Sequence, residues 1–192
     1  MTMLTALRSY QRVQSWHREE ACGCQGPAPA GEWTPIAEIN TVLPESGTGF
    51  RTYNRERDGV DQVGRPGFID QLTSLGEEWA GRSEVPFQVG DISRRGGGPF
   101  PPHSGHQNGN EADLRPFRKD GAMLPVTYTD ANYSQAMTRA WCQMVKEKHP
   151  DAVILFNDPA LIREGLTRHY KGHHNHLHLR IPIEHSTEDV VC

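Results

Sequence analysis

The sequence predicts an α+β domain in which a small antiparallel sheet is flanked by helices. Two stretches, residues 68–79 and 133–149, repeat apolar side chains at helical spacing. Four short stretches are continuously apolar or alternate apolar with polar residues, as strands do: 86–93, 106–117, 152–156 and 177–181. With 192 residues and 35% hydrophobic content, the chain can build one domain around one core.

The N-terminal part of the chain is predicted to be separate from this domain. Residues 4–20 carry one apolar stripe at three-residue spacing, which predicts a packed helix. Residues 22–31 are rich in Gly and Pro, which is typical of a linker. We therefore expect a helix and linker over 1–31 and the functional domain over 32–192. Residues 41–66 contain few apolar positions and are predicted to be mostly loop.

Local signals predict where the helices of the domain begin and end. Gly81 is a plausible stop for the first helix, and the second should end at His149, before Pro150. Asp158 and Pro159 are suited to cap and open a short helix that runs to about Gly165. Residues 94–102 contain three consecutive glycines and three prolines, so they are predicted to be a loop that delivers the chain to the next segment.

Composition excludes several classes of function. A net charge of −4 does not favour a nucleic-acid-binding protein. No apolar run approaches the roughly 18 residues of a membrane span, and the start lacks the pattern of a secretory signal. The four cysteines, Cys22, Cys24, Cys142 and Cys192, do not have zinc-pair spacing; one disulfide involving Cys192 and free thiols both remain open.

Histidine carries the strongest chemical signal. His176 and His178 alternate at the start of the last predicted strand, so their side chains should share one face of the sheet. A third imidazole and a carboxylate could come from His106 and Asp113. We predict that His106, Asp113 and His178 bind a catalytic Zn²⁺, which needs three protein ligands and one position for water. Zinc lowers the pKa of that water to about 7, so it can attack a carbonyl at neutral pH.

The remaining histidines of these two segments are predicted to serve the reaction. His176 is placed to accept a proton or orient the water. His103 and His173 each precede a member of the set by three residues and are expected to bond to the substrate or transition state. A single histidine is more often a surface residue than a ligand, and Glu111 shares strand parity with Asp113 as an alternative carboxylate. His149, His169 and His185 are expected to be solvated, and His174 is left out of the site.

Four segments together resemble the penicillin-insensitive murein endopeptidases. They are Gly90-Asp-Ile-Ser93, Gly96-Gly-Gly-Pro99, His103-Ser-Gly-His-Gln-Asn-Gly-Asn-Glu-Ala-Asp113 and His173-His-Asn-His-Leu-His178. The chain is also similar to the wider zinc-peptidase group that includes lysostaphin-type and D-Ala-D-Ala peptidases and the hedgehog signalling domain. The resemblance spans about residues 33–182 and implies that fold.

The resemblance also implies an activity. The expected reaction is zinc-dependent hydrolysis of D-Ala–meso-diaminopimelate cross-links between peptidoglycan stem peptides, without a serine nucleophile. The residues that match the family's metal ligands are His106, Asp113 and His178. Those that match its site-lining residues are His103, His173 and His176, with His176 as the general base.

Two other classes remain open, and so does delivery to the cell wall. A zinc D,D-carboxypeptidase or dipeptidase acting on D-Ala-D-Ala ends would share the site, and a non-catalytic wall-binding module could retain its zinc. The expected lack of a signal favours a phage lysis enzyme or an exported antibacterial effector over a housekeeping enzyme. Residues 1–31 would then serve export or partner binding, and the partners would be a delivery or immunity protein.

Overall fold

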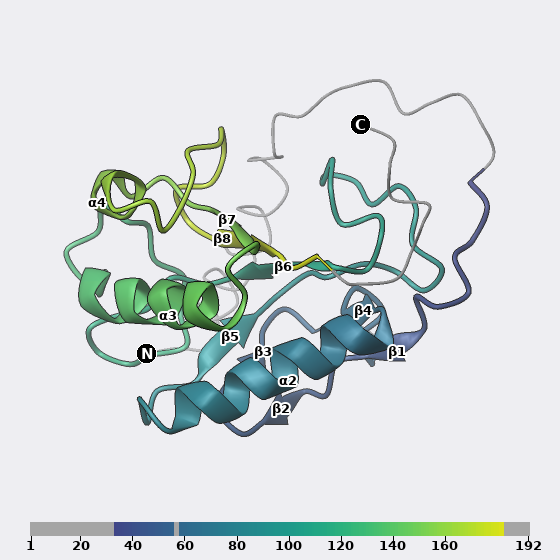
Figure 1. Ribbon diagram of the computed structural model, residues 1–192, viewed down its shortest axis with the longest axis horizontal. Helices are drawn as coiled ribbons and strands as arrows, with labels where there is room; N and C mark the ends of the chain where they lie inside the picture. The colour runs from purple at the N-terminus through teal and green to yellow at the C-terminus, as the bar shows by residue number, and fades with distance from the viewer. Residues whose placement is uncertain (1–32, 56–57, 183–192) are drawn as a thin grey trace, which may run out of the picture.

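The computed structural model describes residues 33–55 and 58–182, and it has the α+β architecture that the sequence predicts (Figure 1). The strands are β1 (Thr41–Val42), β2 (Ser46–Gly47), β3 (Phe50–Thr52), β4 (Val63–Gly64), β5 (Phe87–Val89), β6 (Glu111–Leu114), β7 (Val153–Leu155) and β8 (Leu177–Arg180). The helices are α2 (Pro66–Ala80), α3 (Gln135–Lys148) and α4 (Pro159–Arg163). The main sheet has the order β2-β3-β5-β6-β8-β7, and β1 pairs with β4 separately.

The main sheet is mixed, so the prediction of a purely antiparallel sheet was wrong at one pair. Strands β3 and β5 run parallel, whereas the other neighbouring strands are antiparallel. Helix α2 lies between β3 and β5 in the chain, and a helical crossover of this kind returns the chain in the same direction. The antiparallel half, β6-β8-β7, is the part that carries the predicted site residues.

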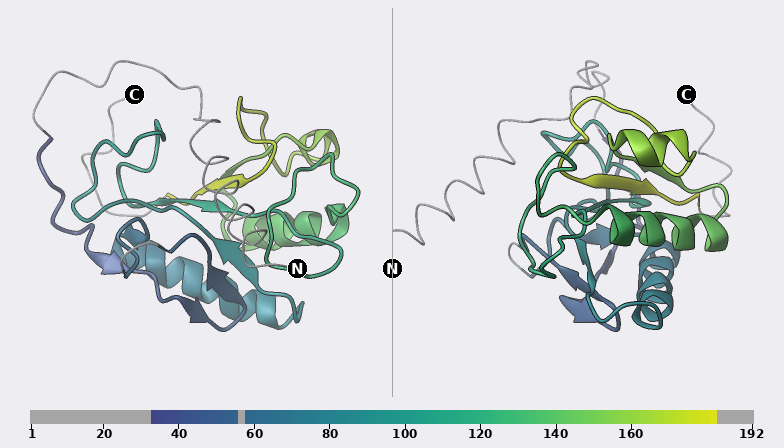
Figure 2. Two further views of the ribbon diagram at one scale, coloured as in Figure 1. Left: turned by 180° about the vertical axis from the view of Figure 1, so that it is seen from behind. Right: turned by 90° about the vertical axis from the view of Figure 1, so that its left-hand side faces the viewer.

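Helices α2 and α3 cover one face of the sheet and enclose the core with it (Figures 1 and 2). The Phe87 ring on β5 lies 5.7 Å from that of Trp141 on α3, and Trp79 on α2 lies 5.0 Å from Phe117. The residues that β6 and β8 direct into this core are at most 1% exposed: Ala112, Leu114, Leu177 and Leu179. Because side chains alternate along a strand, the residues between them point to the opposite face.

The helix ends predicted at Gly81 and His149 and the cap predicted at Asp158 are confirmed. Helix α2 begins at Pro66 and is followed by Gly81. At the start of α3, the Ser134 side chain accepts a hydrogen bond from the Met137 N–H. The Asp158 carboxylate does the same for Ala160 at α4, at 2.8 Å. Each cap satisfies a backbone N–H that lacks a partner within its helix.

Residues 41–66 are mostly loop, as predicted, but four short strands also lie there. Each of β1 to β4 has only two or three residues, which is too short to give a recognisable periodicity. Their pairing buries Leu43 and Phe50, which are at most 1% exposed. The predicted strands 86–93 and 106–117 are likewise reduced to β5 and β6.

Other expectations fall partly outside the described residues. The predicted helix 4–20 and linker 22–31 lie there, as do Cys22, Cys24, Cys192 and His185. Cys142 on α3 is a free thiol in the core, and burial raises its pKa. No helix in the described part of the chain has the length and apolarity that a membrane span requires.

Candidate metal centre and active site

The face of the sheet opposite the core carries a row of site residues. In the antiparallel β6–β8 pair, Asp113 lies directly opposite His178, and His178 lies opposite Leu155 of β7. Residues opposite one another on neighbouring strands have adjacent side chains. The register therefore brings Asp113 and His178 together, although they are 65 positions apart in the chain.

His106 reaches the same point from the loop that precedes β6. This loop contains three consecutive glycines with positive φ, and Gly97 packs so closely on Gln107 that a Cβ would lie 2.2 Å from its carbonyl oxygen. His106 itself has φ of +62°, a conformation that is uncommon for residues other than glycine. Its imidazole is almost fully buried, and Nδ1 contacts the Ile92 carbonyl at 2.9 Å.

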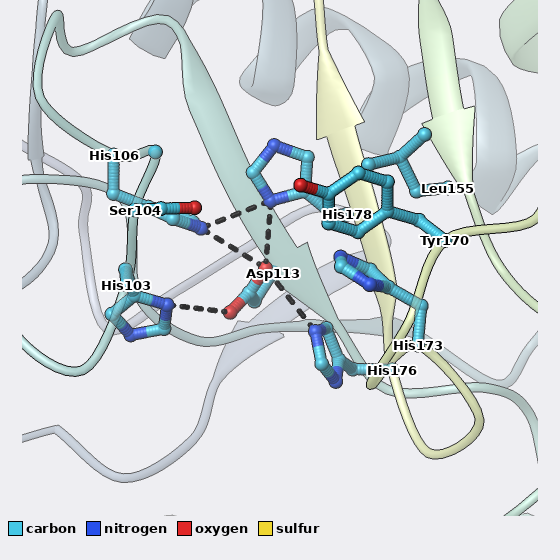
Figure 3. A pocket seen from close by; sticks show the side chains of 10 residues that line it. His103, Ser104, His106, Asp113, Leu155, Tyr170, His173, His176 and His178 are labelled. Atoms are coloured by element: carbon cyan, nitrogen blue, oxygen red, sulfur yellow. Dashed lines mark hydrogen bonds and ion pairs between the residues drawn. The ribbon is translucent and has the colours of Figure 1, made fainter. Parts of the chain in front are cut away.

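Three ligand atoms meet at the floor of the site (Figure 3). His106 Nε2 lies 3.1 Å from Asp113 Oδ1 and 3.0 Å from His178 Nδ1, and the latter two atoms are 3.2 Å apart. Ligands about 2.0–2.2 Å from a tetrahedral zinc would be separated by roughly 3.3–3.5 Å. The triangle formed by these atoms is therefore close to the size that such an ion requires.

The hydrogen-bond partners decide where the protons are. Because the Ile92 carbonyl can only accept, the His106 proton is on Nδ1 and a lone pair of Nε2 points into the triangle. On His178, Nε2 faces the Glu111 carboxylate at 3.8 Å, which leaves Nδ1 to point inward. Asp113 adds a carboxylate oxygen. With His178 also unprotonated on Nδ1, three electron pairs would converge, and a cation is the group that would satisfy all of them; the outer contacts are those that orient ligand histidines in metal sites.

The charges around the triangle also favour a cation. Burial alone would raise the pKa of Glu111, but contacts with His178 and His106 lower it to about 2. Burial likewise opposes charge on His178, yet Asp113 and Glu111 raise its pKa to about 10. The pKa of Asp113 is also well below its usual value, because the charges of His106 and His176 outweigh the effect of burial. Two ionised carboxylates thus stabilise positive charge at this point.

His176 and His173 form one side of the site. The His176 ring is 4.6 Å from that of His173, and its Nε2 is 3.9 Å from Asp113 Oδ1. Its Nδ1 lies 2.7 Å from Asn175 Oδ1. Burial lowers the pKa of His176 to about 3 and that of His173 to about 4, so both imidazoles are neutral at pH 7.

His103 lies on the opposite side, next to His106. Its Nε2 contacts Asp91 Oδ2 at 3.0 Å, and its Nδ1 is 3.6 Å from Asp113 Oδ2. Burial lowers its pKa, but Asp91 and Asp113 more than compensate, so the pKa is raised overall. Ligand atoms of His103, His106 and Asp113 lie within 4.8 Å of one another and form a second group of metal-binding type. That group is wider than the triangle with His178, and one nitrogen of His103 is already bonded to Asp91.

All six predicted site residues line one pocket, which contains four further residues (Figure 3). The pocket is lined by His103, Ser104, Gly105, His106, Asp113, Leu155, Tyr170, His173, His176 and His178. The sequence prediction missed Leu155 and Tyr170, because nothing in their local pattern indicates the site. Glu111, the alternative carboxylate, contacts His178 and the backbone of His106 and does not line the pocket.

The other histidines among the described residues are outside the pocket. His169 is exposed, as expected. The expectation for His149 was wrong, because its side chain is half-buried at the end of α3 and burial lowers its pKa. His174 lies in the turn before β8, where its carbonyl accepts a hydrogen bond from the Tyr128 N–H.

A buried histidine–carboxylate cluster at the floor of a pocket, on the polar face of an α+β domain, is an arrangement typical of hydrolytic metalloenzymes. The family model for penicillin-insensitive murein endopeptidase matches residues 37–157, and the chain belongs to this family of peptidases, which act on the peptidoglycan of the cell wall. The match includes His103, His106 and Asp113 and ends before the segment that carries His178. No curated protein matches the chain.

Proposed function

We propose that the protein is a zinc-dependent D,D-endopeptidase that hydrolyses D-Ala–meso-diaminopimelate cross-links in peptidoglycan. The observation that carries this proposal is the convergence of three atoms of metal-binding type, His106 Nε2, Asp113 Oδ1 and His178 Nδ1, which lie 3.0–3.2 Å from one another. Family membership supports the substrate class. The donor set of two imidazoles and one carboxylate is one that Zn²⁺ accepts in catalytic sites.

His106, Asp113 and His178 would hold the ion. His178 is favoured over His103 as the third ligand because its inward nitrogen completes the smaller triangle, whereas His103 directs Nε2 toward Asp91. Zn²⁺ at this position would act as a Lewis acid that activates a water molecule and polarises the scissile carbonyl. The other residues of the pocket would then accept or donate protons and contact the substrate.

His176 would act as the proton acceptor. The Asn175 amide oxygen accepts a hydrogen bond from His176 Nδ1, which leaves the lone pair of Nε2 directed toward Asp113. Its low pKa keeps it unprotonated at pH 7, so Nε2 is available to accept a proton. His103 and His173 would hydrogen-bond to the substrate or to the transition state.

The most direct test is mass spectrometry of sacculus digests. We expect the wild-type protein to convert cross-linked dimers into monomers, because an endopeptidase cuts between stems. His106→Ala should lose both the metal and the activity. His169→Ala is a matched control, because this exposed histidine lies outside the pocket, and it should digest sacculi as the wild type does.

Two outcomes would contradict the proposal. Release of free D-alanine from monomeric stems, with dimers left intact, would identify a D,D-carboxypeptidase. One equivalent of bound metal with no turnover of purified muropeptides would indicate a non-catalytic wall-binding module.

Three further proposals concern the whole chain. We propose that the domain has the hedgehog and D-Ala-D-Ala peptidase type of fold, and that it occupies residues 32–192. Residues 1–31 would form a separate helix and linker used in delivery. In a phage lysis enzyme or an exported effector, this segment would contact the delivery machinery or an immunity protein.

A further inference from the structure

Asp91 touches the site without lining the pocket. It follows Gly90 in the segment Gly90-Asp-Ile-Ser93, just after β5. Its carboxylate Oδ2 lies 3.0 Å from His103 Nε2. Its main-chain carbonyl accepts a hydrogen bond from the Asp113 N–H at 2.9 Å, and the Gly90 N–H donates to the Asp113 carbonyl at 2.7 Å. One residue is therefore bonded both to a pocket histidine and to the backbone of a proposed ligand.

The side-chain contact determines which nitrogen of His103 faces the pocket. A carboxylate can only accept, so the proton between the two residues is on His103 Nε2. The other nitrogen, Nδ1, is then directed to the pocket side, 3.6 Å from Asp113 Oδ2. Without Asp91 the ring could turn about its Cβ–Cγ bond, and a half-turn would put the Cδ2 carbon in the place of Nδ1 on the pocket side.

Packing around His103 does not by itself fix which ring nitrogen faces the pocket. The His103 ring lies 5.0 Å from that of Phe100 and 4.4 Å from that of His106. These ring contacts restrict the plane of the imidazole, but they do not distinguish Nδ1 from Nε2. The His103 side chain is 15% exposed, so solvent does not supply a strong alternative partner.

We propose that Asp91 is a positioning residue that holds His103 with Nδ1 directed to the scissile peptide. The inference deepens the proposed function and rests on it, because the Asp91–His103 contact affects the reaction only if the pocket is the active site. Asp91 acts through His103 and touches neither the substrate nor the proposed ligand side chains. A carboxylate that orients a histidine from outside the reacting groups is a common device in active sites.

The test compares Asp91→Asn with His103→Ala and with the double variant. Asp91→Asn keeps the size of the side chain but replaces a group that can only accept with an amide that can accept or donate. We expect its kcat on cross-linked muropeptides to fall by about 10–100-fold, with KM and metal affinity unchanged. Because both residues act through one imidazole, the double variant should be no slower than His103→Ala. Asp91→Glu should restore part of kcat.

A matched control is available at Asp61. Its carboxylate pairs with Arg94 at 3.2 Å, and its main-chain carbonyl accepts a hydrogen bond from the Ile92 N–H, so it neighbours Asp91 without contacting His103. Asp61→Asn should retain the wild-type kcat. The proposal is overturned if Asp91→Asn has wild-type kcat, if it loses metal in proportion to kcat, or if its effect adds fully to that of His103→Ala.

A spectroscopic measurement separates this proposal from the proposed function. In the wild-type protein, the Nε2–H proton of His103 should give a downfield NMR signal that is protected from exchange by Asp91, and Asp91→Asn should shift or remove it. If the wild type does not cleave cross-links but shows this Asp91-dependent signal, the proposed function fails and the positioning contact stands. An unchanged signal in Asp91→Asn overturns the positioning role.

Discussion

Two segments deliver the histidines of the triangle, and they differ in how they are built. His178 lies within strand β8, where backbone pairing with β6 and β7 places it opposite Asp113 and Leu155. His106 lies in a glycine-rich loop with φ of +62° and is held by the Ile92 carbonyl. One side of the site is thus positioned by regular sheet register, and the other by an unusual backbone conformation that needs local support.

The largest expected effect is the loss of either histidine. His178→Ala and His106→Ala should both abolish metal binding, a larger loss than the about 10–100-fold typical of residues outside the ligand set. Their stabilities should differ. His106→Ala leaves the Ile92 carbonyl without its donor, at a cost of about 1–3 kcal/mol. His178→Ala keeps the strand pairing but leaves the buried Asp113 and Glu111 carboxylates without their cationic partner, at a larger cost of about 3–5 kcal/mol. Urea unfolding of the metal-free variants measures this difference; equal losses would contradict it.

The second-largest effect is expected on the reaction rate, from a substitution in the segment that carries His178. His176→Ala should retain metal but lose about 10²–10⁴-fold in rate, because a proton acceptor is removed while all three proposed ligands remain. Metal content by elemental analysis and initial rates on purified dimers provide the two readouts. Loss of metal in this variant would place His176 among the ligands.

A smaller effect is expected at Glu111, which joins the two segments. Its carboxylate accepts a hydrogen bond from the His106 main-chain N–H and faces His178 Nε2. Glu111→Gln should weaken metal affinity by about 10–100-fold and leave the fold intact. Competition with a chelator gives the affinity.

The same residue predicts a pH dependence for the metal-free protein. The folded-state pKa of Glu111 is about 2, below its ordinary value of 4.5, so its ionised form stabilises the fold. This contribution is present above about pH 4.5 and is lost as the pH falls toward about 2. Glu111→Gln should therefore flatten the acid side of the stability curve, as measured by thermal unfolding. An unchanged slope would contradict this role.

The smallest effect tests the glycine loop. Gly97 and Gly165 both have positive φ, but a Cβ at Gly97 would meet the Gln107 carbonyl, whereas nothing lies within 4 Å of one at Gly165. Gly165→Ala should cost only the backbone penalty of about 1–2 kcal/mol. Gly97→Ala should cost more and should also weaken metal binding by displacing His106. If the two variants bind metal equally well, the loop tolerates the displacement.

Much of the site was predictable because it lies in regular structure. Alternation along the last strand places His178 on the face opposite Leu177 and Leu179, and the same rule separates Asp113 from Ala112. Helices α2 and α3 follow from their apolar spacing and from the residues at their ends. The four short strands in residues 41–66 could not be predicted from the sequence, because two or three residues carry no measurable periodicity.

Local sequence determined which face each side chain occupies, because alternation and helical spacing are properties of neighbouring residues. It also supplied the residue types whose chemistry suits a metal ion. Tertiary structure alone decided that β6 pairs with β8 in the register that joins Asp113 to His178, and that His106 meets His178 across 72 positions of the chain. It also brought Asp91, Leu155 and Tyr170 to the site, because such contacts depend on how the whole chain buries its apolar faces.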